Sequence, residues 1–468
     1  MRAGKLTRRD MLKLAGLGGA ATVVAACQPQ VVEKTVVVKE AVQVEKEVTR
    51  VVKEVVQPKA AERKPITLVM MYGAQEFPEN ERKLFEEKYA PYKLQFINND
   101  MTKLMAMLAA GQQLDVYRTW GITAPYDVFR RLPLDLTDYF AVSEVFKADD
   151  ILPVNDYYIV HGRRYGFVKD WSPDYSAWIR KDFFTDSGIE PPTPDKPVPL
   201  KTWREWSKPL KRVEGDRILR WGTGWTPLKN PIFYQPTTLA RPRSLFSEDF
   251  TKLRILEDPE ILEIAKFMFD WKQEGGIPSV INPTIGGWTG PDFRDGVSAS
   301  AMYGYWYSGF LMDAKWDLNK NAVMLPAPSW GPTYSNPCAA GTGGAVSSQT
   351  RYSDAAWALF QYFFGEEPAE NRAKIGWGVP GLKHLLDLMP KDQPWRAQVL
   401  AMVRWEMDNS TVFKIDASPY IDPNLVGTVW NKYEEPALKG EMAFEEFLKN
   451  VETDLNEAIK EGMDRAGL

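Results

Sequence analysis

The chain has 468 residues, of which 44% are hydrophobic and 26% charged, and its formal net charge at pH 7 is −4. These proportions are ordinary for a soluble globular chain, and no long basic run occurs in the body, so nucleic acid is not an expected partner. A chain of this length exceeds the size at which a single core stops growing, so two domains are expected in the body.

Residues 1–26 have the anatomy of an export signal, with a basic start, an apolar stretch and small residues before a cysteine. Arg8 and Arg9 resemble the basic pair of a twin-arginine signal. The apolar stretch is shorter than the roughly 20 residues that span a bilayer. The sequence Val-Ala-Ala-Cys at 24–27 resembles a bacterial lipobox, which predicts cleavage before Cys27 and a lipid anchor on it. The alternative is a buried N-terminal helix with a chance cysteine.

Residues 27–64 are rich in valine, glutamate and lysine and separate the predicted anchor from the body. Two apolar series recur every seven residues, as the a and d positions of a heptad do. They are Val37, Val44 and Val51, and Ala41, Val48 and Val55. The heptads favour a charged helical stalk that self-associates as a coiled coil, whereas the weak helix propensity of valine favours a disordered spacer. In both interpretations the segment lifts the body off the membrane.

From Pro65 onward, strands alternate with helices of about a dozen residues, which is typical of a parallel sheet with helical crossovers. The pattern predicts strands at 66–71, 92–97 and 114–117, and helices at 79–89 and 103–111. Tyr72, Asn98 and Trp120 follow these strands. Ligands bind beyond the carboxyl ends of such strands, so these positions are candidates for a binding site.

The middle of the chain, about 170–326, is predicted to form a second lobe. Helices are expected to begin at Thr202 and Asp258, whose side chains can cap a helix start. Further along, the sequence predicts an apolar helix at 354–364 and two helices around 429–433 and 444–459.

Cysteine and histidine are too scarce in the body for a disulfide, a zinc site or a Cys–His dyad. With Cys27 in the anchor, only Cys338 remains, and the only histidines are His161 and His384. We therefore expect no metal and no cofactor, and we interpret Cys338 as a packed thiol.

Short motifs follow one another along the body in a fixed order. They are Leu104 through Ala109-Ala110-Gly111 to Asp115-Val116, Arg164-Tyr165-Gly166-Phe167, Arg180-Lys181-Asp182-Phe183-Phe184, Thr202-Trp203, and Phe293-Arg294-Asp295-Gly296 followed by Ala301-Met302 and Gly304-Tyr305-Trp306. In this order they resemble the family 1 extracellular solute-binding proteins of ABC importers, the group that includes maltose-binding protein. The resemblance covers about 65–468. Leu114 and Val168 stand where that family usually has proline.

The resemblance implies a type II periplasmic-binding-protein-like α/β fold, with two lobes, each a mostly parallel sheet flanked by helices, and a hinge between them. The expected segments are 65–168 and 326–385 in the N-terminal lobe and 169–325 and 386–468 in the C-terminal lobe. The resemblance further implies a monomeric, non-enzymatic receptor on the outer face of the cytoplasmic membrane. Such a receptor binds a carbohydrate in the cleft between the lobes and delivers it to the transmembrane subunits of an ABC permease.

The chain holds 17 Trp, 19 Tyr and 22 Phe, and many of the tryptophans stand beside glycine or proline, which mark loops. Aromatic rings in loops suit a cleft that stacks on the apolar faces of a sugar, while carboxylates and amides bond its hydroxyl groups. The predicted ligand-binding residues are Glu76, Asn98, Asp100, Trp120, Asp170, Trp171, Trp225, Trp288, Tyr305, Trp306, Trp377 and Tyr420. For each, a solvated loop acid, a cap or a packed ring is the structural alternative.

Two other functions stay open at this point. A secreted glycoside hydrolase would also be aromatic-rich and extracytoplasmic, but it needs a pair of catalytic carboxylates, and no acid here stands in a motif that indicates one. A binding protein for a peptide or a polyamine would share the fold and differ in its ligand.

Changing Cys27 to Ser tests the predicted anchor. The variant should leave the membrane fraction, because no other segment of the sequence is apolar over a spanning length. Fractionation of cells followed by detection of the protein measures this, and continued tight membrane association would contradict the lipoprotein interpretation. Replacing Arg8 and Arg9 by lysine separately tests the export route: unchanged export would point to the general secretory route.

Overall fold

The structure is a computed structural model that describes residues 35–37, 51–53, 65–225 and 233–467. The chain divides into two units, 1–65 and 66–468. The signal residues Arg8 and Arg9, the anchor residue Cys27 and most of the segment 27–64 lie outside the described residues. No helix among the described residues is long and apolar enough to cross a bilayer.

In the first unit, β1 (Thr35–Val37) pairs with β2 (Val51–Lys53) in an antiparallel ladder that places Val37 opposite Val51. These six residues are strands, so the predicted helical stalk is wrong for them. β-branched side chains lose freedom in a helix and fit a pleated strand, which explains the difference.

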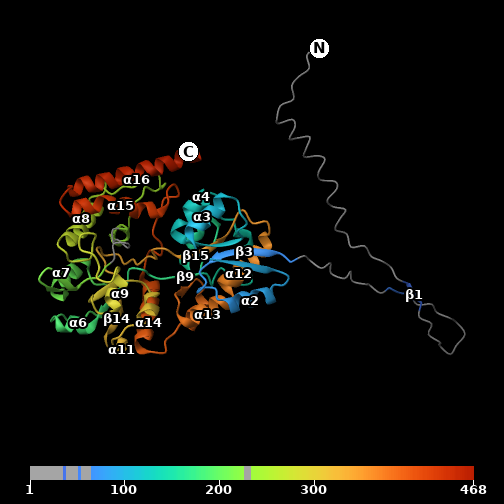
Figure 1. Ribbon diagram of the computed structural model, residues 1–468, viewed down its shortest axis with the longest axis horizontal. Helices are drawn as coiled ribbons and strands as arrows, with labels where there is room; N and C mark the ends of the chain where they lie inside the picture. The colour runs from blue at the N-terminus through green and yellow to red at the C-terminus, as the bar shows by residue number, and fades with distance from the viewer. Residues whose placement is uncertain (1–34, 38–50, 54–64, 226–232, 468) are drawn as a thin grey trace, which may run out of the picture. The chain divides into compact units, whose positions relative to one another are not determined.

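The first sheet of the body contains β3 and β15, which Figure 1 labels, and has the strand order β4-β3-β5-β15-β8. Its strands are β3 (Thr67–Tyr72), β4 (Lys93–Asn98), β5 (Val116–Trp120), β8 (Phe167–Val168) and β15 (Thr342–Val346). β3 runs parallel to β4 and β5, as the sequence predicts, whereas β15 is antiparallel to β5 and β8. The carboxyl ends of the three parallel strands therefore meet at one edge of the sheet.

Helices cover both faces of this sheet. They are α2 (Glu79–Lys88), α3 (Met101–Ala109), α4 (Ala124–Phe129), α5 (Thr137–Ala141), α12 (Ser353–Gly365) and α13 (Glu367–Ile375), with the 3-10 helices η2 (Gly121–Thr123), η3 (Pro153–Tyr158) and η7 (Lys383–Leu388). Alternation along β3 sends Met70 into the core with α12 and Met71 into the core with α3. The predicted apolar helix at 354–364 thus belongs to the first lobe.

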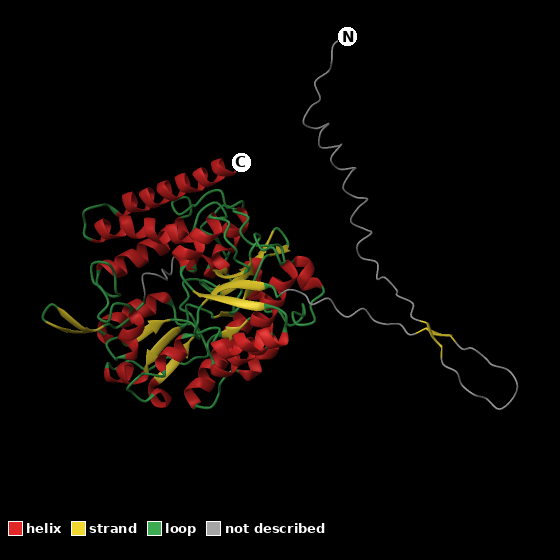
Figure 2. Cartoon of the chain, turned by 45° about the vertical axis from the view of Figure 1, so that its right-hand side comes forward, coloured by secondary structure: helices red, strands yellow, loops and turns green. Residues whose placement is uncertain are grey.

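The second sheet has three strands, β10 (Ala177–Arg180), β13 (Ser300–Met302) and β14 (Ala322–Leu325), in the order β13-β10-β14. Both pairs are antiparallel, so the mostly parallel sheet predicted for this lobe is wrong. Alternating strands and helices indicate which segments are strands, but they do not fix the direction in which a distant strand joins the sheet. Figure 2 shows the two sheets as separate groups of yellow arrows.

Nine helices of the described residues surround the second sheet or extend from it. They are α6 (Lys181–Asp186), α7 (Leu200–Leu210), α8 (Pro259–Gln273), α9 (Thr289–Arg294), α10 (Tyr307–Leu311), α11 (Leu318–Asn321), α14 (Pro394–Asn409), α15 (Pro423–Leu438) and α16 (Phe444–Ala466), together with the 3-10 helix η6 (Gln235–Thr238). Asp258 caps α8 as predicted, whereas Thr202 lies inside α7. α15 and α16 lie side by side and share a core with α8 (Figure 1).

Within the described residues, the chain passes three times between the elements around the first sheet and those around the second. The passages run from β8 to β10, from β14 to β15, and from η7 to α14. Near them, β9 (Asp170–Trp171) pairs with β16 (Val379–Pro380). Short hairpins complete the described strands: β6 (Ile159–Val160) with β7 (Arg163–Arg164), and β11 (Arg212–Glu214) with β12 (Arg217–Arg220). The lobe limits at 168/169, 325/326 and 385/386 stay predictions.

Replacing Trp225 with Ala tests the core of the second lobe. Its ring is 1% exposed and lies 5.2 Å from the rings of Trp203 and Trp271. The change should lower the free energy of unfolding by about 3–5 kcal/mol, because a large buried ring leaves a cavity. The control is Val213→Ala on the β11–β12 hairpin, where the side chain is 59% exposed; it should stay within about 0.5 kcal/mol of the wild type. Urea denaturation measures the free energy of unfolding, and an equal loss in the Trp225→Ala and Val213→Ala variants would contradict this packing.

Candidate functional site

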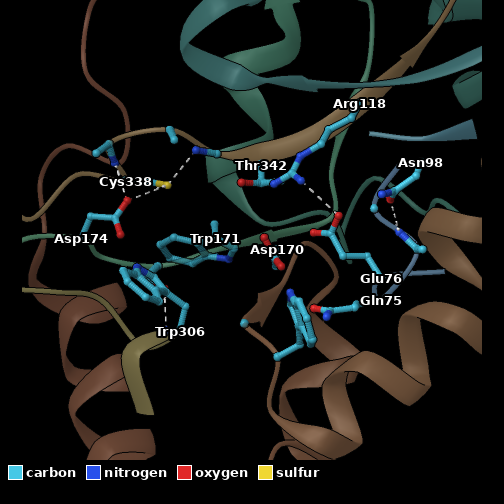
Figure 3. A pocket seen from close by; sticks show the side chains of 18 residues that line it. Gln75, Glu76, Asn98, Arg118, Asp170, Trp171, Asp174, Trp306, Cys338 and Thr342 are labelled. Atoms are coloured by element: carbon cyan, nitrogen blue, oxygen red, sulfur yellow. Dashed lines mark hydrogen bonds and ion pairs between the residues drawn. The ribbon is translucent and has the colours of Figure 1, made fainter. Parts of the chain in front are cut away.

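A cavity of about 670 Å³ lies at the carboxyl ends of β3, β4 and β5, between elements of the two lobes (Figure 3). Its walls come from the turn after β3, the ends of β4 and β5, the passage that holds β9, the start of α10 and the segment before β15. The lining residues are Gly73, Ala74, Gln75, Glu76, Asn98, Arg118, Asp170, Trp171, Ser172, Asp174, Trp306, Cys338, Ala339, Ala340, Gly341, Thr342, Trp377 and Gly378.

A network of ion pairs joins Lys169 to Glu76, Arg118 and Asp170, three of the charged residues that line this cavity. The Lys169 ammonium pairs with Glu76 and lies 2.8 Å from Asp170 Oδ2, while Arg118 Nη1 lies 3.2 Å from Glu76 Oε2. The Lys169 side chain is only 1% exposed. An ammonium buried to this extent needs compensating charge, and the two carboxylates supply it.

Local backbone geometry places Glu76 in this network. The chain turns after β3, where the amides of Glu76 and Phe77 donate to the Gly73 carbonyl. A side chain at Gly73 would put its Cβ 2.3 Å from Glu76 Oε2, so only glycine leaves the carboxylate in place. Strand alternation in β5 turns Arg118 toward the same carboxylate.

The two carboxylates of the network have opposite pKa shifts. Burial alone would raise the pKa of Glu76, but Lys169 and Arg118 outweigh burial and hold that pKa below its usual value. Burial dominates for Asp170 and raises its pKa, although Lys169 opposes the shift. Glu76 is therefore an ionised hydrogen-bond acceptor at neutral pH.

Three tryptophans line the cavity. Trp306 is partly buried and packs against Trp288, with ring centroids 6.4 Å apart and planes 20° from parallel. Trp171 donates from Nε1 to the Pro380 carbonyl at 3.1 Å, which fixes its ring. Trp377 is 37% exposed, and the Lys169 ammonium lies 5.5 Å from its ring centroid. The cavity thus combines flat apolar surfaces with carboxylate, amide and guanidinium groups.

The segment 338–342 forms another wall of the cavity. Asp174 Oδ2 accepts a hydrogen bond of 2.7 Å from the Ala339 amide, and the Cys338 thiol faces the same oxygen (Figure 3). Cys338 is buried, as the prediction of a packed thiol requires, and burial raises the pKa of its thiol.

The structure brings six of the twelve predicted residues into this cavity: Glu76, Asn98, Asp170, Trp171, Trp306 and Trp377. Trp120 lines a neighbouring cavity of about 720 Å³ that shares Arg118, Ala339 and Ala340 with the first. Trp288 lies behind Trp306 and is 37% exposed.

Four predicted residues have other positions, and we no longer expect them to contact a ligand in this cavity. Asp100 caps α3 by accepting from the Lys103 amide, and Trp225 and Tyr305 are core residues with 1% and 2% exposure. Tyr420 packs edge-on against Phe129 and lines a different cavity. Glycine beside an aromatic residue indicates a loop, but it does not tell whether the ring turns inward or outward.

Sequence reasoning missed other lining residues, among them Gln75, Ser172, Asp174 and Thr342. Arg118 and the buried Lys169 were not in the predicted site either. Strand alternation in β5 could have indicated Arg118, whereas the others depend on how distant loops meet. Among residues 35–37, 51–53, 65–225 and 233–467, no group of three His, Cys, Asp or Glu could hold a metal ion.

The variant Glu76→Gln tests the network through pH. Because the folded-state pKa of Glu76 is depressed, its contribution to stability is present above the unfolded value of about 4.5 and is lost as pH falls through the folded value. The wild type should therefore be more stable than the variant at pH 7, and the difference should shrink as pH falls below 4.5. Denaturant titrations at pH 7 and at a pH below 4.5 measure the difference in unfolding free energy between the two proteins. A difference that does not change with pH would contradict the ion-pair network.

No family model and no curated protein matches this chain. Solved structures do match it. The ABC substrate-binding protein Lmo0181 from Listeria monocytogenes, in complex with cycloalternan, is 20% identical with a TM-score of 0.69, over 85% of this chain and 99% of that one. The sugar-binding protein MalE from Xanthomonas citri is 18% identical with a TM-score of 0.66, over 84% and 98%.

Maltose-bound T. maritima MalE3 is 18% identical with a TM-score of 0.64, over 83% of this chain and 99% of that one. At these identities the likeness concerns the fold. The body therefore has the two-lobe α/β fold of periplasmic binding proteins, as the sequence predicts.

Proposed function

We propose that this protein is an extracytoplasmic substrate-binding lipoprotein of an ABC transporter, which binds a carbohydrate between its lobes and delivers it to the permease. The observation that carries the proposal is the cavity itself, in which Trp171, Trp306 and Trp377 lie near the carboxylates of Glu76 and Asp170. Sugars offer apolar faces to aromatic rings and hydroxyl groups to carboxylates and amides. Membership of the family 1 extracellular solute-binding proteins is part of the same proposal.

The charge arrangement favours a sugar over a polyamine. Glu76 and Asp170 already pair with Lys169, and Glu76 also pairs with Arg118. They are therefore positioned as hydrogen-bond acceptors rather than as free counter-ions for a cationic ligand. Similar solved structures include proteins with bound cycloalternan, maltose and mannobiose.

The same pairing supports a receptor rather than a glycoside hydrolase. A hydrolase needs one carboxyl that donates a proton to the glycosidic oxygen and a second that acts as base or nucleophile. Of the three carboxylates that line the cavity, Glu76 and Asp170 share one buried ammonium, and Asp174 accepts a hydrogen bond from the Ala339 amide in the wall. The anchor at Cys27 and the signal with Arg8 and Arg9 complete the proposal, since they would keep the receptor beside a membrane permease.

Replacing Trp306 with Ala tests the ligand site. Removing this ring should weaken binding of a sugar, first identified by calorimetric screening of mono- and oligosaccharides, by about tenfold to a hundredfold, because stacking area is lost. Trp306→Phe should retain much of the affinity. Calorimetry gives the affinity, and thermal melting of the same samples gives the stability.

The matched control is Trp316→Ala. Trp316 is a partly buried tryptophan between α10 and α11 that packs at the edge of the same core but does not line the cavity. The control variant should have a lower melting temperature than the wild type, and its affinity should stay within about twofold of the wild-type affinity. A large loss of stability in Trp306→Ala with intact affinity would remove Trp306 from the ligand site.

A further inference from the structure

Glu406 is a fully buried carboxylate in α14, 0% exposed. Within the described parts of the chain, no lysine, arginine or histidine lies within ion-pair distance of it. Its side-chain partners are three hydrogen-bond donors. Ser176 Oγ and Asn336 Nδ2 donate to Oε1 at 3.0 and 2.8 Å, and the Tyr334 hydroxyl donates to Oε2. A buried carboxylate held only by neutral donors is costly to desolvate, so the arrangement needs an explanation.

The donors belong to two passages between the lobes. Ser176 directly precedes β10, and Tyr334 and Asn336 lie between β14 and β15. Asn336 also bonds directly to the first passage, since its Oδ1 accepts from the Tyr175 amide at 2.8 Å. One carboxylate therefore joins α14 to both passages.

The same passages continue into the wall of the cavity. Trp171, Ser172 and Asp174 precede Ser176, and the lining segment 338–342 follows Asn336. The Cys338 amide donates to the Phe413 carbonyl at 3.1 Å, beyond the end of α14. A shift of either passage at Glu406 therefore moves residues that line the cavity.

We propose that Glu406 is a positioning residue of the ligand site: its ionised carboxylate fixes the two passages that carry the cavity wall, and its protonation loosens them. The consequence for ligand affinity rests on the proposed function, whereas the consequence for the wall does not.

The chemistry follows from donors and acceptors. The ionised carboxylate accepts all three bonds, whereas the protonated form must itself donate from one oxygen. The nearest acceptor at Oε2 is the Tyr334 oxygen, which already accepts from the Ala327 amide at 2.9 Å. Protonation therefore removes the charge that strengthens the three bonds and makes one facing hydroxyl group accept instead of donate, so its own hydrogen must turn away from Glu406.

The titration falls near neutral pH. Burial raises the pKa of Glu406 to about 7, against the hydrogen bonds from Tyr334, Asn336 and Ser176. The facing phenols of Tyr175, Tyr234 and Tyr334 have pKa values raised well above 10 by burial, so they stay neutral.

Other charged groups on the packed elements include Asp174, Arg404 and Asp408. The Asp174 carboxylate accepts from the Ala339 amide. On α14 itself, Arg404 and Asp408 are exposed. Glu406 is thus the group of this cluster whose charge changes between pH 6 and pH 8.

The test uses Cys338 as a reporter. In the full chain carrying Cys27→Ser, Cys338 is the only thiol, and it is 1% exposed in the wall that Glu406 is proposed to hold. We measure the rate at which 4,4′-dithiodipyridine modifies it at pH 6 and pH 8, with and without Glu406→Gln. At pH 8 the Gln variant should react at least about tenfold faster, the factor expected for a lost hydrogen bond to a charged group. At pH 6 the two rates should converge, because the protonated wild type resembles the amide.

Two further variants keep this test sharp. Tyr334→Phe removes one donor and should also speed the reaction at pH 8 more than at pH 6. Glu434→Gln changes another buried glutamate, which pairs with Lys272 away from the cavity. It should leave the dependence of the Cys338 rate on pH unchanged. Equal rates with and without Glu406→Gln at both pH values, or the same acceleration from Glu434→Gln, would overturn the inference.

Ligand binding gives a separate readout. For a sugar found by calorimetry, wild-type affinity should fall about tenfold from pH 8 to pH 6, and Glu406→Gln should bind at both pH values as the wild type does at pH 6. A wild-type affinity independent of pH, with Trp306→Ala still impaired, would overturn this inference and leave the proposed function standing. Absence of sugar binding together with the expected Cys338 rates would overturn the proposed function and leave Glu406 as the residue that positions the wall.

Discussion

The Lys169 ammonium, enclosed by Glu76 and Asp170, is the interaction on which the cavity depends. A lysine that is 1% exposed cannot stay charged without nearby carboxylates, so its presence fixes where both acids lie. Glu76 comes from the turn after β3 and Asp170 from β9, in the first passage between the lobes. One buried cation therefore ties the sheet edge of the first lobe to the connection toward the second.

The second constraint is Glu406, whose hydrogen-bond donors come from two of the passages between the lobes. The Lys169 ammonium forms ion pairs with acidic side chains, whereas the Glu406 carboxylate accepts hydrogen bonds from neutral donors. Between these clusters run Trp171, Ser172 and Asp174, all of which line the cavity. The two clusters hold the connections that carry these residues, which keeps the groups that line the cavity in register.

Much of the first lobe could be predicted from sequence, because local patterns specify it. The continuous apolar run of β3, the alternation in β4 and the apolar residues of α3 and α12 are visible over a few residues. The sequence did not predict that β10 runs antiparallel to β13 and β14, because the direction of these strands depends on long connections.

In the candidate site, too, sequence could predict some residues and not others. Asn98 follows a strand, and Asp170, Trp171 and Trp306 stand in or beside family-like motifs, so sequence could propose them. Trp225 stands beside a glycine as Trp377 does, yet its ring is in the core, because Trp203 and Trp271 enclose it from helices far along the chain. Asp174 and Glu406 were missed because their roles arise only where separate passages meet.

The measurement that tests the account most directly is calorimetric titration of the Cys27→Ser protein with a panel of mono- and oligosaccharides, with assays for glycoside cleavage on the same mixtures. The account predicts saturable binding of a sugar, a weaker interaction after Trp306→Ala, and no cleavage product. Cleavage of a glycoside, or binding that persists unchanged when Trp306 and Glu76 are both replaced, would contradict it.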